Sequence, residues 1–277
     1  MGTTDSDEGG NPGSWLGYFG EELRLARDAQ GISGRQLASQ TSYSYQQLCN
    51  VEKGRRTPSE AFTNEVDAAL GTGERFARIL RRVLAEALPD WFQGAAREEA
   101  QAIRIRTYRS QVVHGLLQTE EYARALIRAS QPRATHERIE ALVAARAARQ
   151  AIFKSEEPPY FWTILDEAVL RRPVGGRGVM AEQLERLLKE CANPNVTVQI
   201  LPFAAGAHAA TDGDFTLWSY QDRSDVLYVE GLWTTALKEH VTEVENARLK
   251  YDLLQAAALP REQSADMIRD ILEGYAA

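Results

Sequence analysis

A short polar segment, residues 44–56, holds side chains whose types suit recognition of nucleic-acid bases and phosphates. A glutamine or asparagine side chain can make two hydrogen bonds to the edge of adenine, and a tyrosine can donate to a base or pack on a thymine methyl group. Lysine and arginine side chains bind backbone phosphates. We therefore predict base contacts from Tyr45, Gln46, Gln47 and Asn50, and phosphate contacts from Ser44, Lys53, Arg55 and Arg56. The competing interpretation is that these residues form only a solvated polar face of a helix.

A second group of residues, in the C-terminal half, combines aromatic rings with a histidine near adjacent predicted strands. Amphipathic rings and a pH-sensitive hydrogen-bond donor suit a ligand pocket or a protein interface. We predict that a ligand or a partner protein binds at Phe203, His208, Trp218, Tyr228 and Trp233. The alternative is that these aromatic side chains simply belong to the hydrophobic core, and their exposure distinguishes the two interpretations.

The sequence lacks the common catalytic and metal-binding patterns. The four histidines are His114, His136, His208 and His240. They include no pair at the spacing of the HExxH motif and no cluster with cysteine, so a zinc site is not expected. There is no GxSxG elbow and no Walker sequence, and Gly175–Gly178 lacks the third glycine of a dinucleotide-binding motif. A loop histidine such as His208 could do acid–base chemistry with nearby carboxylates, but we predict no enzyme, no cofactor and no metal.

Short helices are expected to position the polar segment. From Tyr18, apolar residues recur at helical spacing until Gly31. Ser33 and Ser44 are good N-caps for two further short helices, and Gly54 ends the second of them. Another helix is predicted over residues 59–70. Two short helices joined by a turn of three or four residues form the helix-turn-helix arrangement, whose second helix fits the major groove of DNA.

Residues 19–58, FGEELRLARDAQGISGRQLASQTSYSYQQLCNVEKGRRTP, resemble the repressor-type helix-turn-helix family typified by phage repressors and Cro. The similarity includes the Leu-Ala of the second helix, the Val-Glu-Lys-Gly that closes the third helix, and the Arg-Arg-Thr-Pro that follows. The resemblance implies that Tyr45, Gln46 and Asn50 face the major groove, with Gln47 at its margin.

The same resemblance has two structural implications. It implies an ion pair between Arg27 and Glu52 that ties the first helix to the third. The family often has glutamine at the first position of the second helix, where it anchors a phosphate, and this sequence has Gly34 there. Cys49 also stands where a small polar residue is common. These two departures predict weaker DNA binding than that of a phage repressor.

The C-terminal half mixes helices and strands in a pattern typical of an α+β domain. Helices are predicted over residues 72–91, 97–102, 119–129, 135–153, 181–192, 238–257 and 261–275. Strands are predicted at 103–105, over the run PPYFWTILDEAVL at 158–170, and at 196–200, 215–220 and 226–232. The expected fold class is therefore an all-α helix-turn-helix domain followed by an α+β domain.

Ordered blocks within residues 100–271 resemble the C-terminal domain of bacterial regulators described as WhiJ-like or antitoxin-like. They include HGLLQTEEYARAL, LDEAVLRRPVGG, MAEQLERLL and NVTVQILPFAAGAHAATDGDFTLWSY. That family has no assigned chemistry, and its genes usually lie beside one for a small partner protein. The resemblance implies that the domain binds this partner and adjusts DNA binding. His114 stands where the family usually has proline before Gly-Leu-Leu.

Composition and charge fit two ordinary globular parts. The chain has 277 residues, of which 44% are hydrophobic and 26% are charged. No apolar run reaches the roughly 18 residues of a membrane span, and two distant cysteines fit a reducing cytoplasm. The net charge of −7 is uneven, because residues 15–85 carry +2 and residues 86–277 carry −6. This distribution permits nucleic-acid contact at the N-terminal end only.

We predict a disordered tail over residues 1–14, a helix-turn-helix domain over 15–85, and a regulatory, partner-binding and dimerisation domain over 86–277. The expected protein is a cytoplasmic homodimer that binds a double-stranded DNA operator sequence-specifically and regulates transcription. Its C-terminal domain is expected to sense a small protein from a neighbouring gene or a small-molecule effector. The alternative is an antitoxin-like interaction module that neutralises a small partner, with DNA binding secondary.

Overall fold

The computed structural model describes residues 14–231 and 235–276 and divides into two compact units. The first unit runs to Leu88 and also includes Arg133–Ala145, while the second comprises Pro89–Pro132 and the chain from Arg146 onwards. The first unit is helical, and the second contains a six-stranded mixed sheet with helices. The structure thus confirms the expected fold class. No helix among the described residues is both long and apolar enough to cross a membrane.

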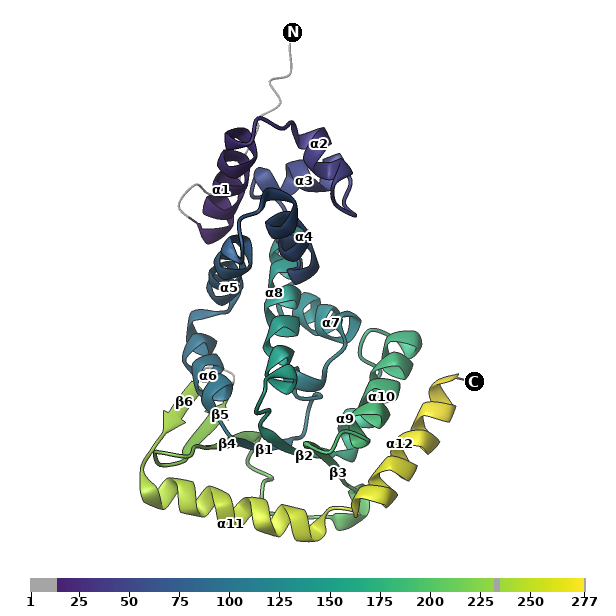
Figure 1. Ribbon diagram of the computed structural model, residues 1–277. Coiled ribbons are helices and arrows are strands. Elements are labelled where there is room, and N and C mark those ends of the chain that lie inside the picture. The colour runs from purple at the N-terminus through teal and green to yellow at the C-terminus, as the bar shows by residue number, and fades with distance from the viewer. Residues whose placement is uncertain (1–13, 232–234, 277) are drawn as a thin grey trace. The chain divides into compact units, whose positions relative to one another are not determined.

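Five helices open the first unit, and Figure 1 labels each of them. They are α1 (Trp15–Ala29), α2 (Gly34–Ser39), α3 (Tyr45–Glu52), α4 (Glu60–Leu70) and α5 (Arg75–Ala87). Ser33 and Ser44 cap α2 and α3 as predicted, each in a reciprocal capping box with a glutamine three residues later. Gly31 and Gly54 end the helices before them with φ near +65°, a conformation that glycine adopts without strain.

The core of the first unit lies between α1, α3, α4 and α5. Phe19 of α1 packs against Phe76 of α5, with their ring centroids 5.4 Å apart. The fully or almost fully buried side chains include Phe19, Leu23, Leu37, Leu48, Val51, Phe62, Val66, Leu70, Phe76 and Leu80. Because each of the five helices α1–α5 contributes to one cluster, burial of these apolar surfaces fixes the short helices that could not persist alone.

The single helix predicted over residues 72–91 is wrong, because α5 ends at Ala87 and a new helix, α6 (Asp90–Gln101), begins beyond Pro89. The proline ring disfavours helical geometry in the residue before it. Leu88 is accordingly extended, with φ −64° and ψ 141°. This break coincides with the division between the two units.

The sheet of the second unit has the strand order β3-β2-β1-β4-β5-β6. Its strands are β1 (Arg104–Arg109), β2 (Tyr160–Asp166), β3 (Val196–Leu201), β4 (Phe215–Ser219), β5 (Val226–Glu230) and β6 (Thr235–Lys238). The pairs β1–β2 and β2–β3 are parallel, whereas β1–β4, β4–β5 and β5–β6 are antiparallel. Three neighbouring parallel strands therefore end at the same edge of the sheet.

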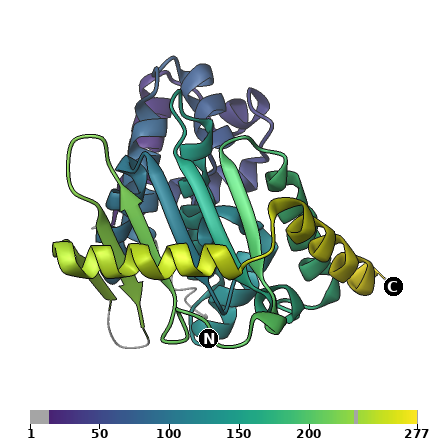
Figure 2. The same cartoon turned by 90° about the horizontal axis from the view of Figure 1, so that it is seen from below.

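Helices cover both faces of this sheet. The long α11 (Val241–Ala257) crosses one face (Figure 2), while α6, α7 (Glu120–Ser130) and α10 (Arg177–Cys191) lie on the other (Figure 1). The second unit also contains α9 (Glu167–Arg171) and α12 (Arg261–Ala276), which packs on α10 and β3. The last turn of α8 (His136–Arg149) belongs to this unit from Arg146 onwards. Each face has its own hydrophobic core.

Two predicted elements of the second unit need correction. The run predicted as a strand over 158–170 is strand β2 followed at once by helix α9, because Asp166 caps a new helix by accepting from the Ala168 N–H at 2.9 Å. The helix predicted from residue 238 begins at Val241, and Thr235–Lys238 forms the edge strand β6. That strand is defined by its pairing with β5, a contact that local sequence patterns do not reveal.

Replacement of Gly20 by alanine is expected to destabilise the first unit. A Cβ atom there would lie 2.7 Å from the carbonyl oxygen of Val51, and helix backbone cannot yield as a flexible side chain can. We expect a loss of about 1–3 kcal/mol in the free energy of unfolding, measured by denaturant titration. Gly178→Ala is the control, because nothing lies within 4 Å of its Cβ position in α10 and alanine favours helix. Equal stability of the Gly20→Ala variant and the wild type would contradict the close contact of α1 with α3.

Candidate functional sites

Helix α3 presents a polar face to solvent and an apolar face to the core. Tyr45 is 47% exposed and Gln46 is exposed, while Asn50 is partly buried. Gln46 and Asn50 are four residues apart, so their side chains lie on the same side of the helix. On the opposite side, Leu48 and Val51 are buried. The predicted base-contacting residues thus share the solvent side of one short helix, and their contact with DNA stays a prediction.

Gln47 and Ser44 form the capping box at the start of α3. The Gln47 Oε1 atom accepts from the Ser44 N–H at 2.8 Å, and the Ser44 Oγ atom accepts from the Gln47 N–H at 3.3 Å. These bonds satisfy backbone donors that the first turn of a helix leaves open. The amide group of Gln47 and the hydroxyl hydrogen of Ser44 are still available to donate. The margin position expected for Gln47 fits this partly engaged side chain.

Gly34 makes room for the ring of Tyr45. A Cβ atom at Gly34 would lie 2.9 Å from the Tyr45 ring, so a larger residue would displace it. The guanidinium of Arg35 lies over the same ring, 5.6 Å from its centroid, and interaction with the Cys49 thiol raises the pKa of the Tyr45 hydroxyl. Gly34 and Cys49, the two positions that differ from the repressor-type pattern, therefore both lie beside Tyr45. The sequence did not predict this connection. Gly34 lies on a different helix from Tyr45, and Cys49 was considered separately from both.

The predicted ion pair between α1 and α3 is confirmed. Arg27 Nε donates to Glu52 Oε1 at 2.7 Å, and both side chains are only 13% exposed. The hydrogen bond to Glu52 raises the pKa of the Arg27 guanidinium. Arg27 Nη1 also donates to the carbonyl of Ile32 at 3.1 Å, in the turn before α2. The Arg27 side chain thus joins α1, the turn that follows it and α3.

Backbone hydrogen bonds hold the turn that carries the basic residues after α3. The carbonyl oxygen of Asn50 accepts from the N–H groups of Arg55 at 2.8 Å and Arg56 at 3.2 Å. Arg56 is exposed, and Lys53 is exposed at the C-cap of α3. Phosphate contact by these residues stays a prediction, and the turn holds their backbone directly beside the end of the polar helix face.

The described members of the group predicted to bind a ligand or partner do not share one site. Trp218 and Tyr228 are 1% and 2% exposed and stack on each other within one core of the second unit, with centroids 5.4 Å apart. Phe203 is 57% exposed. Trp233 lies outside the described residues. The interpretation as core residues therefore holds for Trp218 and Tyr228, and a binding role for the group stays untested.

His208 lies on the side of the sheet opposite to Trp218. Its Nε2 atom is 3.3 Å from the hydroxyl of Tyr108, which belongs to the second core, and its Nδ1 atom accepts from the Ala210 N–H at 3.3 Å. Burial is the main cause of the raised pKa of Tyr108, followed by the charge of Asp166. His208 is thus a loop histidine with local hydrogen bonds on both ring nitrogens. Among the described residues, no three His, Cys, Asp or Glu side chains are grouped so as to hold a metal ion.

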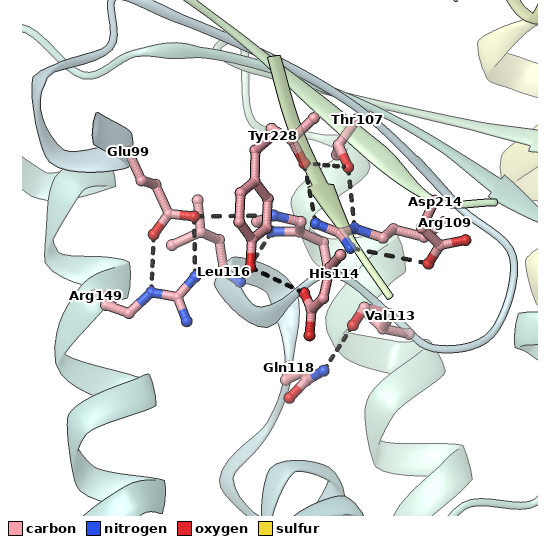
Figure 3. A network of polar contacts seen from close by, with 12 residues as sticks. Glu99, Thr107, Arg109, Val113, His114, Leu116, Gln118, Arg149, Asp214 and Tyr228 are labelled. Carbon is pink, nitrogen blue, oxygen red and sulfur yellow. Dashed lines mark hydrogen bonds and ion pairs between the residues drawn. The ribbon is translucent and has the colours of Figure 1, made fainter. Parts of the chain in front are cut away.

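A polar network that the sequence did not predict lies inside the second unit (Figure 3). Arg149 pairs with Glu99 through two hydrogen bonds, from Nε at 2.8 Å and from Nη2 at 2.9 Å. Its guanidinium also lies over the ring of Phe92, 4.4 Å from the centroid, and Gly115 leaves it room, because a Cβ there would be 3.3 Å from Nη1. Glu99 is only 2% exposed, so this pair compensates a buried carboxylate.

Arg109 and Tyr228 extend the network across the sheet. Arg109 donates to the hydroxyl groups of Thr107 at 3.1 Å and Thr216 at 3.0 Å, and its Nη1 lies 3.8 Å from a carboxylate oxygen of Asp214 (Figure 3). The Tyr228 hydroxyl donates to Glu230 at 3.4 Å. Burial and the charge of Glu230 raise the pKa of Tyr228. The network therefore combines two largely enclosed arginines with the carboxylates of Glu99, Asp214 and Glu230.

His114 is buried within this network and is held in its neutral form. Its Nδ1 atom accepts from the Leu116 N–H at 3.2 Å, and its Nε2 atom is 3.9 Å from Glu99. Burial, and then the charges of Arg109 and Arg149, lower the pKa of His114 well below its usual value. Its backbone has φ −58° and ψ 140°, the conformation of proline. The histidine thus has the turn geometry that a proline at this position would give.

His114 is expected to make folding stability depend on pH. The unfolded chain binds a proton at this histidine below about pH 6.5 and the folded chain does not, so stability is full above that pH and falls as the pH decreases. The loss is roughly 1.4 kcal/mol for each pH unit. His114→Asn keeps an acceptor for the Leu116 N–H, and we expect it to remove this slope between pH 6.5 and 5 in denaturant titrations. His136→Asn, at a histidine that is 70% exposed, should leave the slope unchanged, and an unchanged slope in His114→Asn would refute the assignment.

Comparison with protein families matches both parts of the chain. A helix-turn-helix domain matches residues 19–79, which contain α2 and α3, and supports a DNA-binding helix-turn-helix regulator. No curated protein and no solved structure matches the chain. A domain of unknown function, DUF5753, matches residues 92–270, which hold the sheet and the buried polar network. This match covers more than half of the sequence, and the chain belongs to the DUF5753 family.

Proposed function

We propose that the protein is a repressor-type, sequence-specific transcriptional regulator in which α3 enters the major groove of a double-stranded operator. The observation that carries the proposal is the polar face of α3, with exposed Gln46 and partly buried Asn50 four residues apart and a largely enclosed ion pair behind it. Glutamine and asparagine at this spacing suit contacts with neighbouring adenines. The exposed ring of Tyr45 adds a group for a thymine methyl or a phosphate.

Phosphate contacts would fix the register of this helix. Ser44 stands at its N-terminus, and Lys53, Arg55 and Arg56 follow its C-terminus, so potential phosphate donors flank the polar face at both ends. Contacts of this kind orient a protein on DNA and carry no sequence information. In this proposal, sequence specificity comes from Tyr45, Gln46 and Asn50, with Gln47 at the margin.

The C-terminal unit would dimerise and sense a second molecule. Its resemblance to WhiJ-like and antitoxin-like regulators supports a small protein from a neighbouring gene as one candidate, and a small-molecule effector is the other. The first experiment is selection of bound sequences from a randomised DNA pool at physiological salt, with and without that neighbouring protein. Enrichment of one motif supports the regulator, and a change on adding the partner supports sensing. Partner binding without any DNA enrichment would favour an antitoxin-like module instead.

Substitution of the groove residues is expected to relax sequence preference. Gln46→Ala and Asn50→Ala each remove a side chain that can read a base edge, so each should lose roughly 1–3 kcal/mol on the selected operator and little on random DNA. Fluorescence anisotropy with both DNAs measures the difference. Arg56→Ala should weaken both DNAs alike and reduce the salt dependence by about one counterion.

Gln221→Ala, at an exposed turn of the second unit, is the matched control and should bind as the wild type does. If Gln46→Ala and Asn50→Ala both keep the wild-type preference, α3 does not read the bases as proposed.

Two copies of the chain are expected on each operator. A single short recognition helix offers few base contacts, and two-fold symmetric modules bind half-sites about 34 Å apart. The selected motif should therefore be palindromic with centres one helical turn apart, and analytical ultracentrifugation should give the mass of two chains on the operator. A complex with one chain, at any protein concentration, would exclude the homodimer.

A further inference from the structure

Within the described part of the second unit, one arginine next to the polar network has no carboxylate at ion-pair distance. Arg146 lies on the last turn of α8, three residues before Arg149. Its Nη1 donates to Oε1 of Gln118 at 2.7 Å, which is a neutral acceptor. Among the described residues, no carboxylate oxygen lies within 4.0 Å of its guanidinium, whereas Arg149 has Glu99 and Arg109 has Asp214.

The surroundings of Arg146 disfavour its positive charge. Burial, and then the neighbouring charge of Arg149, lower the pKa of Arg146 to about 10, and Arg109 acts in the same direction. Glu230 is the acid that opposes them, although it lies beyond ion-pair distance and hydrogen-bonds with Tyr228. A desolvated cation beside two other cations is a costly arrangement unless an anion joins it.

Arg146 and Arg149 converge on the same turn of the chain. Arg149 packs on Gly115, and Arg146 donates to Gln118, whose own amide group donates to the carbonyl of Val113 at 2.6 Å. The two bonds to Glu99 use Nε and Nη2 of Arg149, so its Nη1 atom is the donor left beside this turn. Side chains at positions three apart face the same side of a helix. Two guanidinium groups are thus held in place beside one segment, residues 113–118.

We propose that Arg146, with Arg149 and Arg109 beside it, binds the oxyanion group, a carboxylate or a phosphate, of a small molecule. Guanidinium groups donate to such oxygens in paired, charge-assisted hydrogen bonds. The ligand is small because Arg109 and Arg149 are only 12% and 14% exposed, too deep for the flat surface of a protein or for the backbone of a DNA duplex. This inference names the ligand class for the sensing role proposed above, but binding itself does not depend on DNA.

The test uses the full chain in phosphate-free buffer, with inorganic phosphate as one probe and succinate as the other. Isothermal titration calorimetry and the thermal unfolding midpoint are followed at constant ionic strength, set with sodium chloride. We expect saturable binding of one probe, accompanied by a rise in the midpoint. Phosphate binding alone identifies a phosphorylated ligand, and succinate binding alone identifies a carboxylic acid.

Arg146→Gln is the decisive variant, because it removes the charge and keeps an amide that can bond Gln118. Its affinity for the probe should fall about tenfold or more, while its midpoint without probe should not fall. Arg128→Gln, at an exposed arginine of α7, should bind as the wild type does. Glu230→Gln removes the opposing acid and should bind the probe more tightly, which tests the site with Arg146 intact.

Two results would overturn the proposal: no saturable binding of either probe, or equal binding by the wild type and Arg146→Gln. Neither result would affect the DNA-binding proposal, which rests on a different unit of the chain.

Discussion

An arginine that leaves water must find a carboxylate or enough hydrogen bonds, and both units of this protein are arranged around that constraint. In the first unit, Arg27 meets Glu52 and the carbonyl of Ile32, and these contacts join α1, the following turn and α3. In the second, Arg149 meets Glu99 between α6 and the end of α8. Each pair links segments far apart in sequence, so each fixes tertiary arrangement as well as charge. The charge of Arg146 is compensated incompletely, since its acceptor is the neutral Gln118, and this residue is the basis of the proposed ligand site.

The parts of the fold that depend on nearby residues were predictable from the sequence. Serine caps, glycine stops and helical spacing of apolar residues located α1, α2 and α3, because each of these signals acts within one turn of helix. The ion pair between Arg27 and Glu52 was foreseen through family resemblance. The close approach of α1 to α3 at Gly20 was not, although a glycine in the middle of an otherwise regular helix is the signal that could have found it.

The site residues of the second unit were less predictable, because residues that are neighbours along a strand enter different faces of the sheet. Alternate residues of a strand point to opposite faces. Trp218 and Tyr228 consequently enter one core, while Tyr108, the partner of His208, enters the other. The polar network was also not predictable, because Glu99 and Arg149 are fifty positions apart in the sequence and no local pattern joins them. The edge strand β6 was missed for the same reason, because only its pairing with β5 defines it.

The distribution of cations separates two kinds of recognition. Around α3, the basic residues include exposed side chains such as Lys53 and Arg56, where they can follow the phosphates of a large, regular polyanion. In the second unit, which belongs to the acidic part of the chain, Arg109 and Arg149 are enclosed by the sheet and by α6 and α8. An acidic surface repels a polyanion at long range, whereas a small anion that reaches the interior meets guanidinium groups in a medium where charge interactions are stronger. In these proposals the same residue type contacts DNA in one unit and a small ligand in the other, and burial makes the difference.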